Sequence, residues 1–107
     1  YDQPLPRLLA RQIDQAEPID PHRIPQVSVV DQRMAAAMKQ ANIPYFSAYR
    51  SLCRPDCRLW VKPGIPVQFD YGHLTQQGSI LVADLMVREI RPQLAAMAKM
   101  TDMARLQ

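Results

Sequence analysis

The sequence predicts an α/β chain. The first observation is a helix, a short turn and a strand in succession between Val27 and Ala48, which make half of an α/β unit. The second is a long apolar helix that follows Thr75. The third is the composition, because 48% hydrophobic and 21% charged residues are typical of a globular protein. With 107 residues, the chain forms one small domain or part of a larger one.

The first third of the chain contains two predicted helices separated by a loop. Apolar residues in segment 5–16 recur at helical spacing, and Pro18 ends that helix. Residues 18–25 contain three prolines and are expected to form a loop. Residues 27–41 again place apolar side chains on one helical face, and Asn42 is expected to close this second helix.

The middle of the chain is predicted to be extended and then irregular. Residues 43–48 are an apolar and aromatic run directly behind a helix, which predicts a strand. Residues 49–69 have no periodicity and are rich in proline, so they are expected to form a long irregular loop. A loop of roughly twenty residues in a compact domain is usually functional or held by a cross-link.

The last helix begins after Thr75, which is a good N-cap residue. Apolar residues continue at helical steps as far as Leu94, and Pro92 is expected to kink or break the helix. Beyond Pro92 an apolar stripe continues at three-residue steps, and we expect it to be a helix edge that covers core. This stripe consists of Met97, Met100, Met103 and Leu106.

Charge and hydropathy exclude several classes of protein. The net charge is +3 and the basic residues are scattered, whereas nucleic-acid binders usually concentrate Lys and Arg on one face. No apolar run reaches the ~18–20 residues of a membrane span, and no signal peptide is visible. Because the chain starts at Tyr1 rather than at methionine, we expect a processed product or part of a longer protein.

Cys53 and Cys57 are the only cysteines, and three interpretations remain open. A disulfide would pin the long loop and would indicate an oxidising compartment. Two unrelated buried thiols are the second interpretation. A metal site with His22 or His73 is the third, although zinc needs four ligands and the two histidines are far apart in the sequence.

Asp70 and His73 are the candidate catalytic residues, three positions apart just before the last helix. In nucleophilic catalysis a carboxylate orients an imidazole, and the imidazole takes the proton of the nucleophile. A tight turn that contains Gly72 can bring the Asp70 side chain back to Nδ1 of His73, which leaves Nε2 free. The alternative is that an Asp-x-x-His sequence arises by chance as polar chemistry at a helix entry.

The segment from Pro66 to Ser79 resembles the last sequence block of the GDSL/SGNH hydrolase superfamily. More closely, it resembles the extracytoplasmic SGNH domain fused to membrane O-acyltransferases that acetylate bacterial surface polysaccharides. That block contains an aromatic-Asp pair, two residues, His-Leu-Ser/Thr and then a terminal helix. The cysteine pair after Leu52 and the helix–strand sequence that ends at Ser47 match the same branch. The resemblance covers approximately residues 25–95.

The resemblance implies the C-terminal portion of a flavodoxin-like three-layer αβα domain, with Asp70 and His73 as the acid and base of a Ser-His-Asp triad. The family's Gly-Asp-Ser nucleophile motif is absent, as are its oxyanion-hole blocks. We therefore expect residues 1–98 to be a partial SGNH-like domain and residues 99–107 a helical or disordered tail. Alone, this chain is expected to be inactive.

The expected function is acetyl transfer to a sugar hydroxyl, in a parent tethered to the periplasmic face of a membrane. The expected partners are the upstream half of the domain, a membrane acyltransferase domain and a carbohydrate acceptor, with no cofactor, metal or nucleic acid. A secreted esterase fragment and a non-catalytic interaction module remain alternatives. Because a half domain exposes core surface, we expect the isolated chain to form homo-oligomers.

Overall fold

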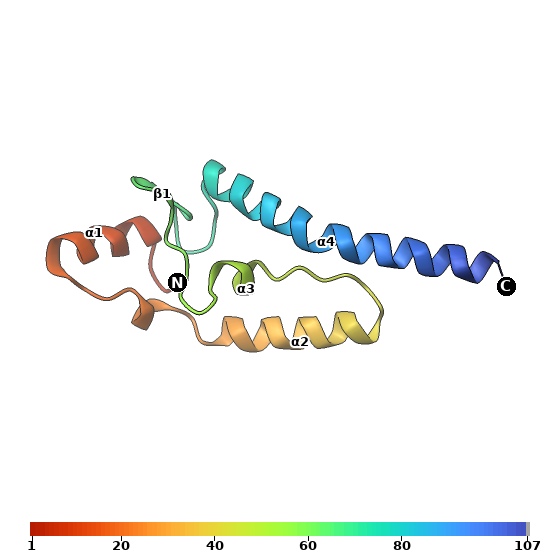
Figure 1. Cartoon of the computed structure of the whole chain (residues 1–107). Helices are drawn as coiled ribbons and strands as arrows, with labels where there is room; N and C mark the ends of the chain where they lie inside the picture. Colours follow the sequence, from red (N-terminus) through yellow and green to blue (C-terminus); the bar gives the residue numbers. More distant parts are fainter. Residues whose placement is uncertain (107) are drawn as a thin grey trace.

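The computed structural model describes residues 1–106 as helices joined by irregular segments and one short hairpin (Figure 1). Its elements are α1 (Leu5–Gln15), the 3₁₀ turn η1 (Asp20–His22), α2 (Gln26–Gln40), α3 (Ala48–Leu52), β1 (Trp60–Lys62), β2 (Ile65–Pro66) and α4 (Gln76–Arg105). This mixture is compatible with the α/β class. Among residues 1–106 the two strands pair only with each other, so the three-layer arrangement stays a prediction.

The described chain is elongated. Its extents are 65 × 26 × 20 Å and its radius of gyration is 17.5 Å, compared with about 13 Å for a compact domain of 100 residues. α1 and the hairpin form one end of the molecule, and the second half of α4 projects from the other (Figure 1). We infer that much of the apolar surface of these helices has no partner among residues 1–106.

A small core at the end that contains α1 buries the apolar face predicted for this helix. Helix α1 begins one residue after Pro4 and ends where Ala16 adopts a left-handed conformation, so the predicted helix 5–16 is confirmed. Its leucines are joined in the core by a residue from the proline-rich segment. The core residues are Leu5, Leu8, Leu9 and Ile19, with Tyr1, Leu59 and Trp60 partly buried against them.

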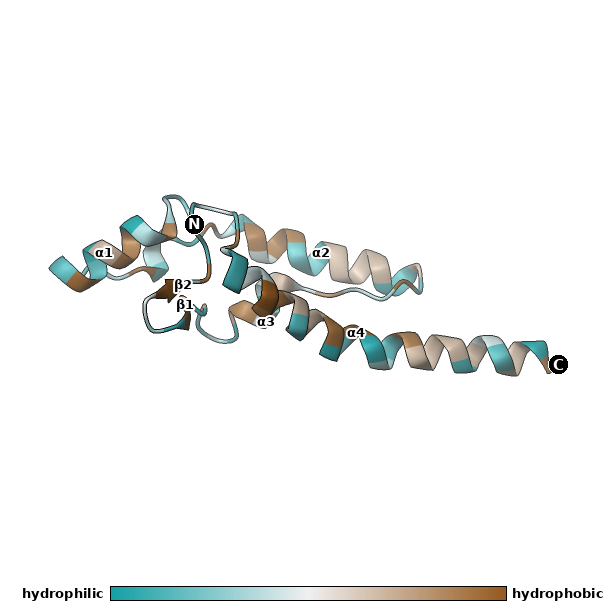
Figure 2. Cartoon of the chain, turned by 90° about the horizontal axis from the view of Figure 1, so that it is seen from above, coloured by the Kyte–Doolittle hydropathy of each residue, from teal (hydrophilic) through white to brown (hydrophobic). Residues whose placement is uncertain are grey.

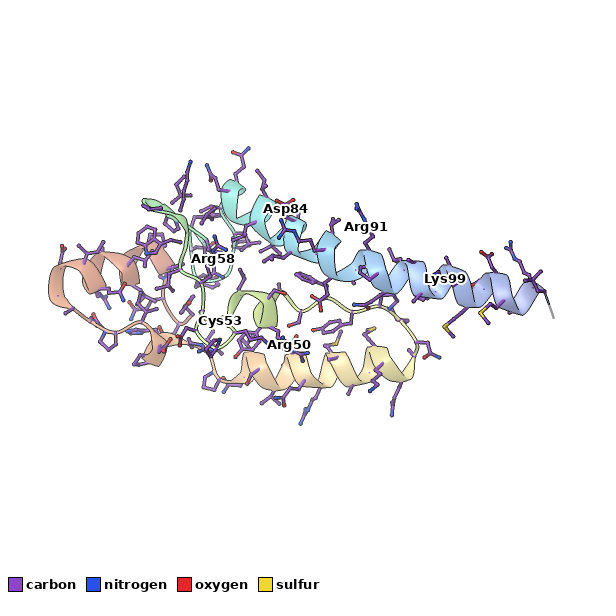
Figure 3. All side chains as sticks on the ribbon, in the orientation of Figure 1. Arg50, Cys53, Arg58, Asp84, Arg91 and Lys99 are labelled. Atoms are coloured by element: carbon purple, nitrogen blue, oxygen red, sulfur yellow. A yellow bond between two sulfur atoms is a disulfide. The ribbon has the colours of Figure 1, made fainter. Side chains whose placement is uncertain are left out.

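Helix α2 confirms the helix predicted for residues 27–41, but the residue that it buries, Asp31, is polar. Asn42 follows it with a φ of 56°, the left-handed conformation that closes a helix. Asp31 is buried and accepts a hydrogen bond from the Tyr45 hydroxyl at 2.6 Å. Arg50, a residue of α3 that Figure 3 labels, places its guanidinium 3.8 Å from the same carboxylate. A polar cluster therefore attaches α2 to the chain that follows it.

The electrostatics of this cluster favour the charged form of Asp31. Burial alone would raise the pKa of this carboxyl group. Hydrogen bonds from Ser47 and Tyr45 and the charge of Arg50 act in the opposite direction and hold the pKa below its ordinary value. The same hydrogen bond raises the pKa of the Tyr45 hydroxyl, which stays protonated as the donor.

The strand predicted for residues 43–48 is wrong for the described chain. Residues 43–47 run as an extended segment between α2 and α4, as Figures 1 and 2 show from two directions. Within residues 1–106 the backbone N–H groups of Tyr45 and Phe46 have no hydrogen-bond partner, because no other extended segment lies alongside. Ser47 instead caps α3, since its hydroxyl oxygen accepts the Arg50 N–H at 2.9 Å.

The prediction of an irregular loop over residues 49–69 is also wrong in part. This region contains most of α3 and an antiparallel hairpin in which Trp60 pairs with Pro66. Gly64 turns the hairpin with a φ of 85°, a conformation that glycine adopts without strain. These elements are only two to five residues long, too short to show a periodic hydrophobic pattern.

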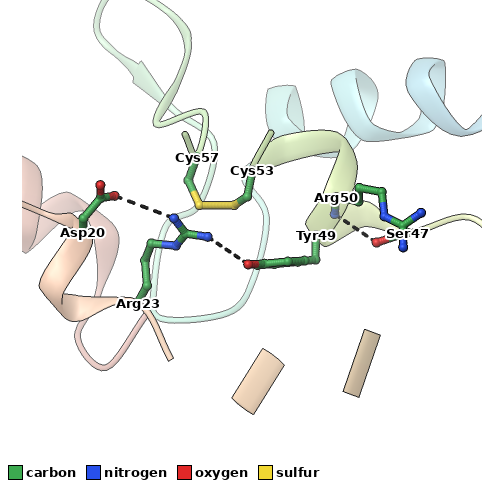
Figure 4. Close-up of a disulfide and its surroundings, with 7 residues drawn as sticks. All are labelled: Asp20, Arg23, Ser47, Tyr49, Arg50, Cys53 and Cys57. Atoms are coloured by element: carbon green, nitrogen blue, oxygen red, sulfur yellow. Dashed lines mark hydrogen bonds and ion pairs between the residues drawn. A yellow bond between two sulfur atoms is a disulfide. The ribbon is translucent and has the colours of Figure 1, made fainter. Parts of the chain in front are cut away.

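Cys53 and Cys57 form a disulfide, which decides among the three interpretations of this pair (Figure 4). The disulfide closes the turn after α3, and the backbone N–H of Arg58 donates to the carbonyl of Leu52 beside it. The phenol of Tyr49 accepts a hydrogen bond from Arg23 at 2.9 Å next to this turn. The hydrogen bond between Arg23 and Tyr49 thus links α3, next to the disulfide, to the segment after η1.

Replacing both cysteines with serine is expected to lower the free energy of unfolding by about 2 kcal/mol, because the cross-link closes only a short loop in the unfolded chain. Urea unfolding followed by circular dichroism measures this difference. Reduction of the wild-type chain is the control and should give the same midpoint as the double variant. A loss much larger than 2 kcal/mol would contradict a purely local role for the cross-link.

Helix α4 runs without interruption through Pro92, so the expected break does not occur. Thr75 is the N-cap as predicted, with its hydroxyl oxygen accepting the Gly78 N–H at 2.9 Å. The prediction that the methionine stripe covers core is wrong here, since Met100 and Met103 are 70% and 64% exposed. None of the helices in the described part of the chain is long and apolar enough to cross a membrane.

Candidate functional site

The candidate site lies in a tight turn between the hairpin and α4. Gln68 and Leu74 form an isolated antiparallel bridge. Inside it, the backbone N–H of Phe69 donates to the carbonyl of His73 at 3.1 Å. Residues 70–72 are thus a three-residue connection, and its ends are fixed by backbone hydrogen bonds. This local hairpin presents Asp70 and His73 just before the first turn of α4.

Asp70 and His73 are directly hydrogen-bonded. Oδ2 of Asp70 lies 2.6 Å from Nδ1 of His73, and Oδ1 accepts the backbone N–H groups of Gly72 at 2.8 Å and of His73 at 2.6 Å. The sequence predicted this pairing across a turn that contains Gly72. Because both oxygens of the carboxylate are engaged, its orientation is set by the backbone as well as by the imidazole.

The turn keeps the Asp70 carboxylate ionised. The backbone N–H of Gly72 and then that of His73 are the largest causes, and together with the imidazole they lower the pKa of Asp70 to about 2. An ionised carboxylate is only an acceptor, so Nδ1 of His73 is the donor. The pairing therefore stabilises the fold above the ordinary pKa of Asp, and this contribution is lost as the pH falls through about 2.

The opposite edge of the imidazole is free. The His73 side chain is 71% exposed, and within residues 1–106 no hydrogen bond reaches its Nε2. A histidine with Nδ1–H held by a carboxylate and with Nε2 open can act as a general base toward an incoming hydroxyl. The turn therefore presents an imidazole that a carboxylate orients and whose Nε2 is accessible.

The serines of the chain have other local roles. Ser47 caps α3, and Ser28 donates to the carbonyl of Pro25. Ser51 lies within α3 and Ser79 in the first turn of α4. Among residues 1–106 none of them is hydrogen-bonded to His73.

The cysteines and His22, which the metal-site interpretation requires, make other interactions in the structure. The cysteines are joined to each other, so neither offers a thiolate. His22 is paired with carboxylates through both ring nitrogens, and within residues 1–106 no group of three His, Cys, Asp or Glu residues is arranged to hold an ion.

His22 holds the N-terminal segment, which in turn contacts the backbone of the candidate site. We call this set of contacts the His22 brace. Its Nδ1 lies 2.9 Å from Asp2 and its Nε2 3.2 Å from Glu17. The N–H of Asp2 also donates to the His22 carbonyl, and the N–H of Leu5 donates to the carbonyl of Asp70 at 3.3 Å. The sequence pattern does not predict this set of contacts, because it depends on residues from three separate segments.

The His22 brace is expected to make the stability of the chain depend on pH. Hydrogen bonds to Asp2 first and to Glu17 second raise the pKa of His22 above its ordinary value. The stabilisation is fully present below the ordinary pKa of histidine, about 6.5, and is lost as the pH rises through the raised value. Thermal unfolding at a series of pH values from 5.5 to 8.5 should show the melting temperature falling.

His22→Gln is the matched variant for this titration, since glutamine keeps one donor but does not titrate in this range. His73 is present in both proteins, so the difference between the two pH profiles reports His22 alone. Identical slopes for wild type and His22→Gln would refute the pH-dependent brace.

Most of the chain matches a known protein family. A family model described as "SGNH domain (fused to AT3 domains)" matches residues 2–88. Neither the curated proteins nor the solved structures contain a match to this chain. The matched region includes the disulfide, the local hairpin and both residues of the Asp–His pair. It ends within α4, which continues for another 17 residues to Arg105.

Proposed function

Since the chain belongs to the family of SGNH domains fused to AT3 domains, we propose that it carries the acid and the base of a Ser-His-Asp triad in an O-acyltransferase. The observation that carries this proposal is the 2.6 Å contact between Asp70 Oδ2 and His73 Nδ1, with Nε2 left open. The serine comes from sequence upstream of this chain. The family accounts for the transferase class, and the local geometry accounts for the two residues.

The reaction needs four proton transfers at Nε2 of His73, two in each half-reaction. First, Nε2 takes the serine hydroxyl proton while the serine oxygen bonds to the acyl carbon, and the proton then passes to the leaving oxygen as its bond to that carbon breaks. Next, Nε2 takes the proton of a sugar hydroxyl, whose oxygen attacks the acyl-serine. The proton finally returns to the serine oxygen. Asp70 stabilises the imidazolium in each half-reaction.

A groove beside the extended segment is the proposed binding site for the upstream half of the domain. A groove of about 620 Å³ separates the extended segment at Tyr45 from Met97 and Met100 of α4. The extended segment lines the groove with residues 43–45, and apolar residues of α2 and α4, including Ala35 and Ala96, line its sides. Among residues 1–106 the backbone N–H groups of Tyr45 and Phe46 have no hydrogen-bond partner. We infer that upstream strands pair with this segment and place it in the central sheet of a three-layer domain.

The parent protein is proposed to be membrane-associated, with this domain on the extracytoplasmic side. The disulfide supports an oxidising compartment, because such cross-links persist outside the reducing cytosol. The proposed acceptor is a hydroxyl group of a surface polysaccharide and the proposed acyl group is acetyl. Both assignments rest on the resemblance of the segment from Pro66 to Ser79 to domains fused to membrane O-acyltransferases.

A fluorophosphonate probe, which labels activated serines, tests the proposal. The 107-residue chain should not be labelled, whereas a longer chain that includes the upstream sequence should be labelled, and His73→Ala should abolish that labelling. Labelling of the 107-residue chain that depends on His73 would show a serine nucleophile within it and refute the half-site. Labelling of the longer chain that survives His73→Ala would refute His73 as the base.

The same longer chain separates a transferase from an esterase. Supplied with an activated acetyl ester and an oligosaccharide acceptor, it should form acetylated sugar that mass spectrometry detects. Release of free acetate alone, with no acetylated sugar at any acceptor concentration, would assign the domain to the esterases instead.

A further inference from the structure

The aromatic ring of Phe69 lies against the imidazole of His73. The ring centroids are 5.8 Å apart and the planes differ by 18°, so the two rings are stacked. This stack follows from the local hairpin, because the Phe69 N–H to His73 carbonyl bond places the two residues opposite each other. Their side chains therefore project on the same face of the turn.

Phe69 is not a core residue in the described chain. Its side chain is 58% exposed, while its neighbour Val67 is buried. An exposed phenylalanine contributes little to the core, yet this one covers one face of the candidate base. The stack and the Asp70 bond act on different parts of the imidazole, one on a face and the other on the Nδ1 edge.

We propose that Phe69 is a positioning residue for His73. Rotation of the imidazole about its Cβ–Cγ bond would break the Asp70 contact and tilt the ring out of the stack, so the two interactions select the same ring orientation. The aromatic face is also electron-rich and attracts the positive charge that His73 carries after it accepts a proton. The Nε2 edge remains open to a hydroxyl.

The variants Phe69→Leu and Phe69→Tyr separate this role from simple packing. Leucine keeps an apolar side chain at the position but removes the aromatic face. Tyrosine restores the face, and its hydroxyl points into solvent at an exposed position. A positioning role requires leucine to fail and tyrosine to succeed, whereas a packing role lets both variants behave similarly.

NMR of the imidazole groups in the 107-residue chain provides the test. The chain has two histidines, and His22 serves as an internal reference because its contacts are with Asp2 and Glu17. In the wild type the carbon-bound ring protons of His73 should be shifted upfield by the phenyl ring. ¹⁵N shifts should show the Nδ1–H tautomer.

Phe69→Leu should remove the upfield shift and reduce the population of the Nδ1–H tautomer of His73, while the His22 signals stay in place. Phe69→Tyr should restore both signals. Wild-type His73 protons at unperturbed positions, or an unchanged tautomer in Phe69→Leu, would overturn the proposal. Loss of the signals in both variants would also overturn it, since the effect would then not depend on the aromatic face.

The consequence for catalysis rests on the proposed function. In the longer chain that contains the serine, Phe69→Leu is expected to lower kcat about ten-fold with KM unchanged, because the substrate would still bind while the base is misaligned. The NMR result does not require a working enzyme. If the longer chain proves inactive while the stack and its tautomer effect are present, the proposed function fails and the positioning role stands.

Discussion

In the proposed acyltransferase, completed by the upstream serine, Asp70→Asn is expected to lower kcat by about 10⁴-fold while the domain remains folded. The asparagine amide can donate a hydrogen bond to Nδ1 of His73, which would favour the tautomer with the proton on Nε2. That tautomer cannot take a proton from the serine. The expected loss is large because the substitution changes the protonation pattern of the base rather than its location.

Asp84→Asn is the matched control for this substitution. Asp84 is an exposed aspartate on α4 (Figure 3), so its replacement changes the net charge equally without touching the turn. Initial rates at saturating donor and acceptor should be near wild type for Asp84→Asn. If Asp70→Asn retains more than a tenth of the wild-type kcat, Asp70 is not the residue that orients the base.

Gly78→Ala is expected to lower the free energy of unfolding by about 3 kcal/mol, the size of a severe overpacking effect. An added Cβ would lie 2.2 Å from the carbonyl oxygen of Val67 and 3.0 Å from the hydroxyl oxygen of Thr75. The nearest atom is the backbone carbonyl oxygen of Val67, which cannot rotate away as a flexible side chain could. The hydroxyl of Thr75 donates to the carbonyl of Pro66 at 2.8 Å. This hydrogen bond and the close approach of Gly78 to Val67 hold the start of α4 against the end of β2.

The sign of this effect distinguishes tertiary contact from helix propensity. In an ordinary helix interior, glycine to alanine stabilises by about 1 kcal/mol. Ser79→Ala is the control, because Ser79 is exposed in the same helical turn and its replacement should be neutral or slightly stabilising. Urea unfolding compares the three proteins. A Gly78→Ala chain as stable as the wild type would mean that α4 does not approach Val67 closely.

Several features could be predicted from local sequence because the interactions that produce them are local. The apolar periodicity of α1, α2 and α4, the Thr75 cap and the closing residue Asn42 depend on neighbours within one or two turns. The Asp–His pair belongs to the same class, since its two residues are three positions apart on one tight turn. The disulfide was one of three interpretations, and the sequence alone did not decide among them.

Other features depend on segments that are far apart in the chain. A strand forms only when another strand is available to pair with it, so the β-branched and aromatic character of residues 43–48 was insufficient. The carboxylate of Asp31 is buried because Tyr45 and Arg50 reach it from outside α2. Nothing in the spacing of Asp2, Glu17 and His22 indicated that they meet.

By itself, the sequence determined where the three longer helices form, the Thr75 cap of α4 and the chemistry of the turn that presents His73. Those outcomes require only hydrogen bonds and periodicity within short stretches of chain. The tertiary structure decided which apolar faces are buried, how closely Gly78 approaches Val67 and which side chains meet Asp31. Such outcomes depend on the surface that each side chain meets, and apolar patterning specifies that a face should be covered without specifying by what.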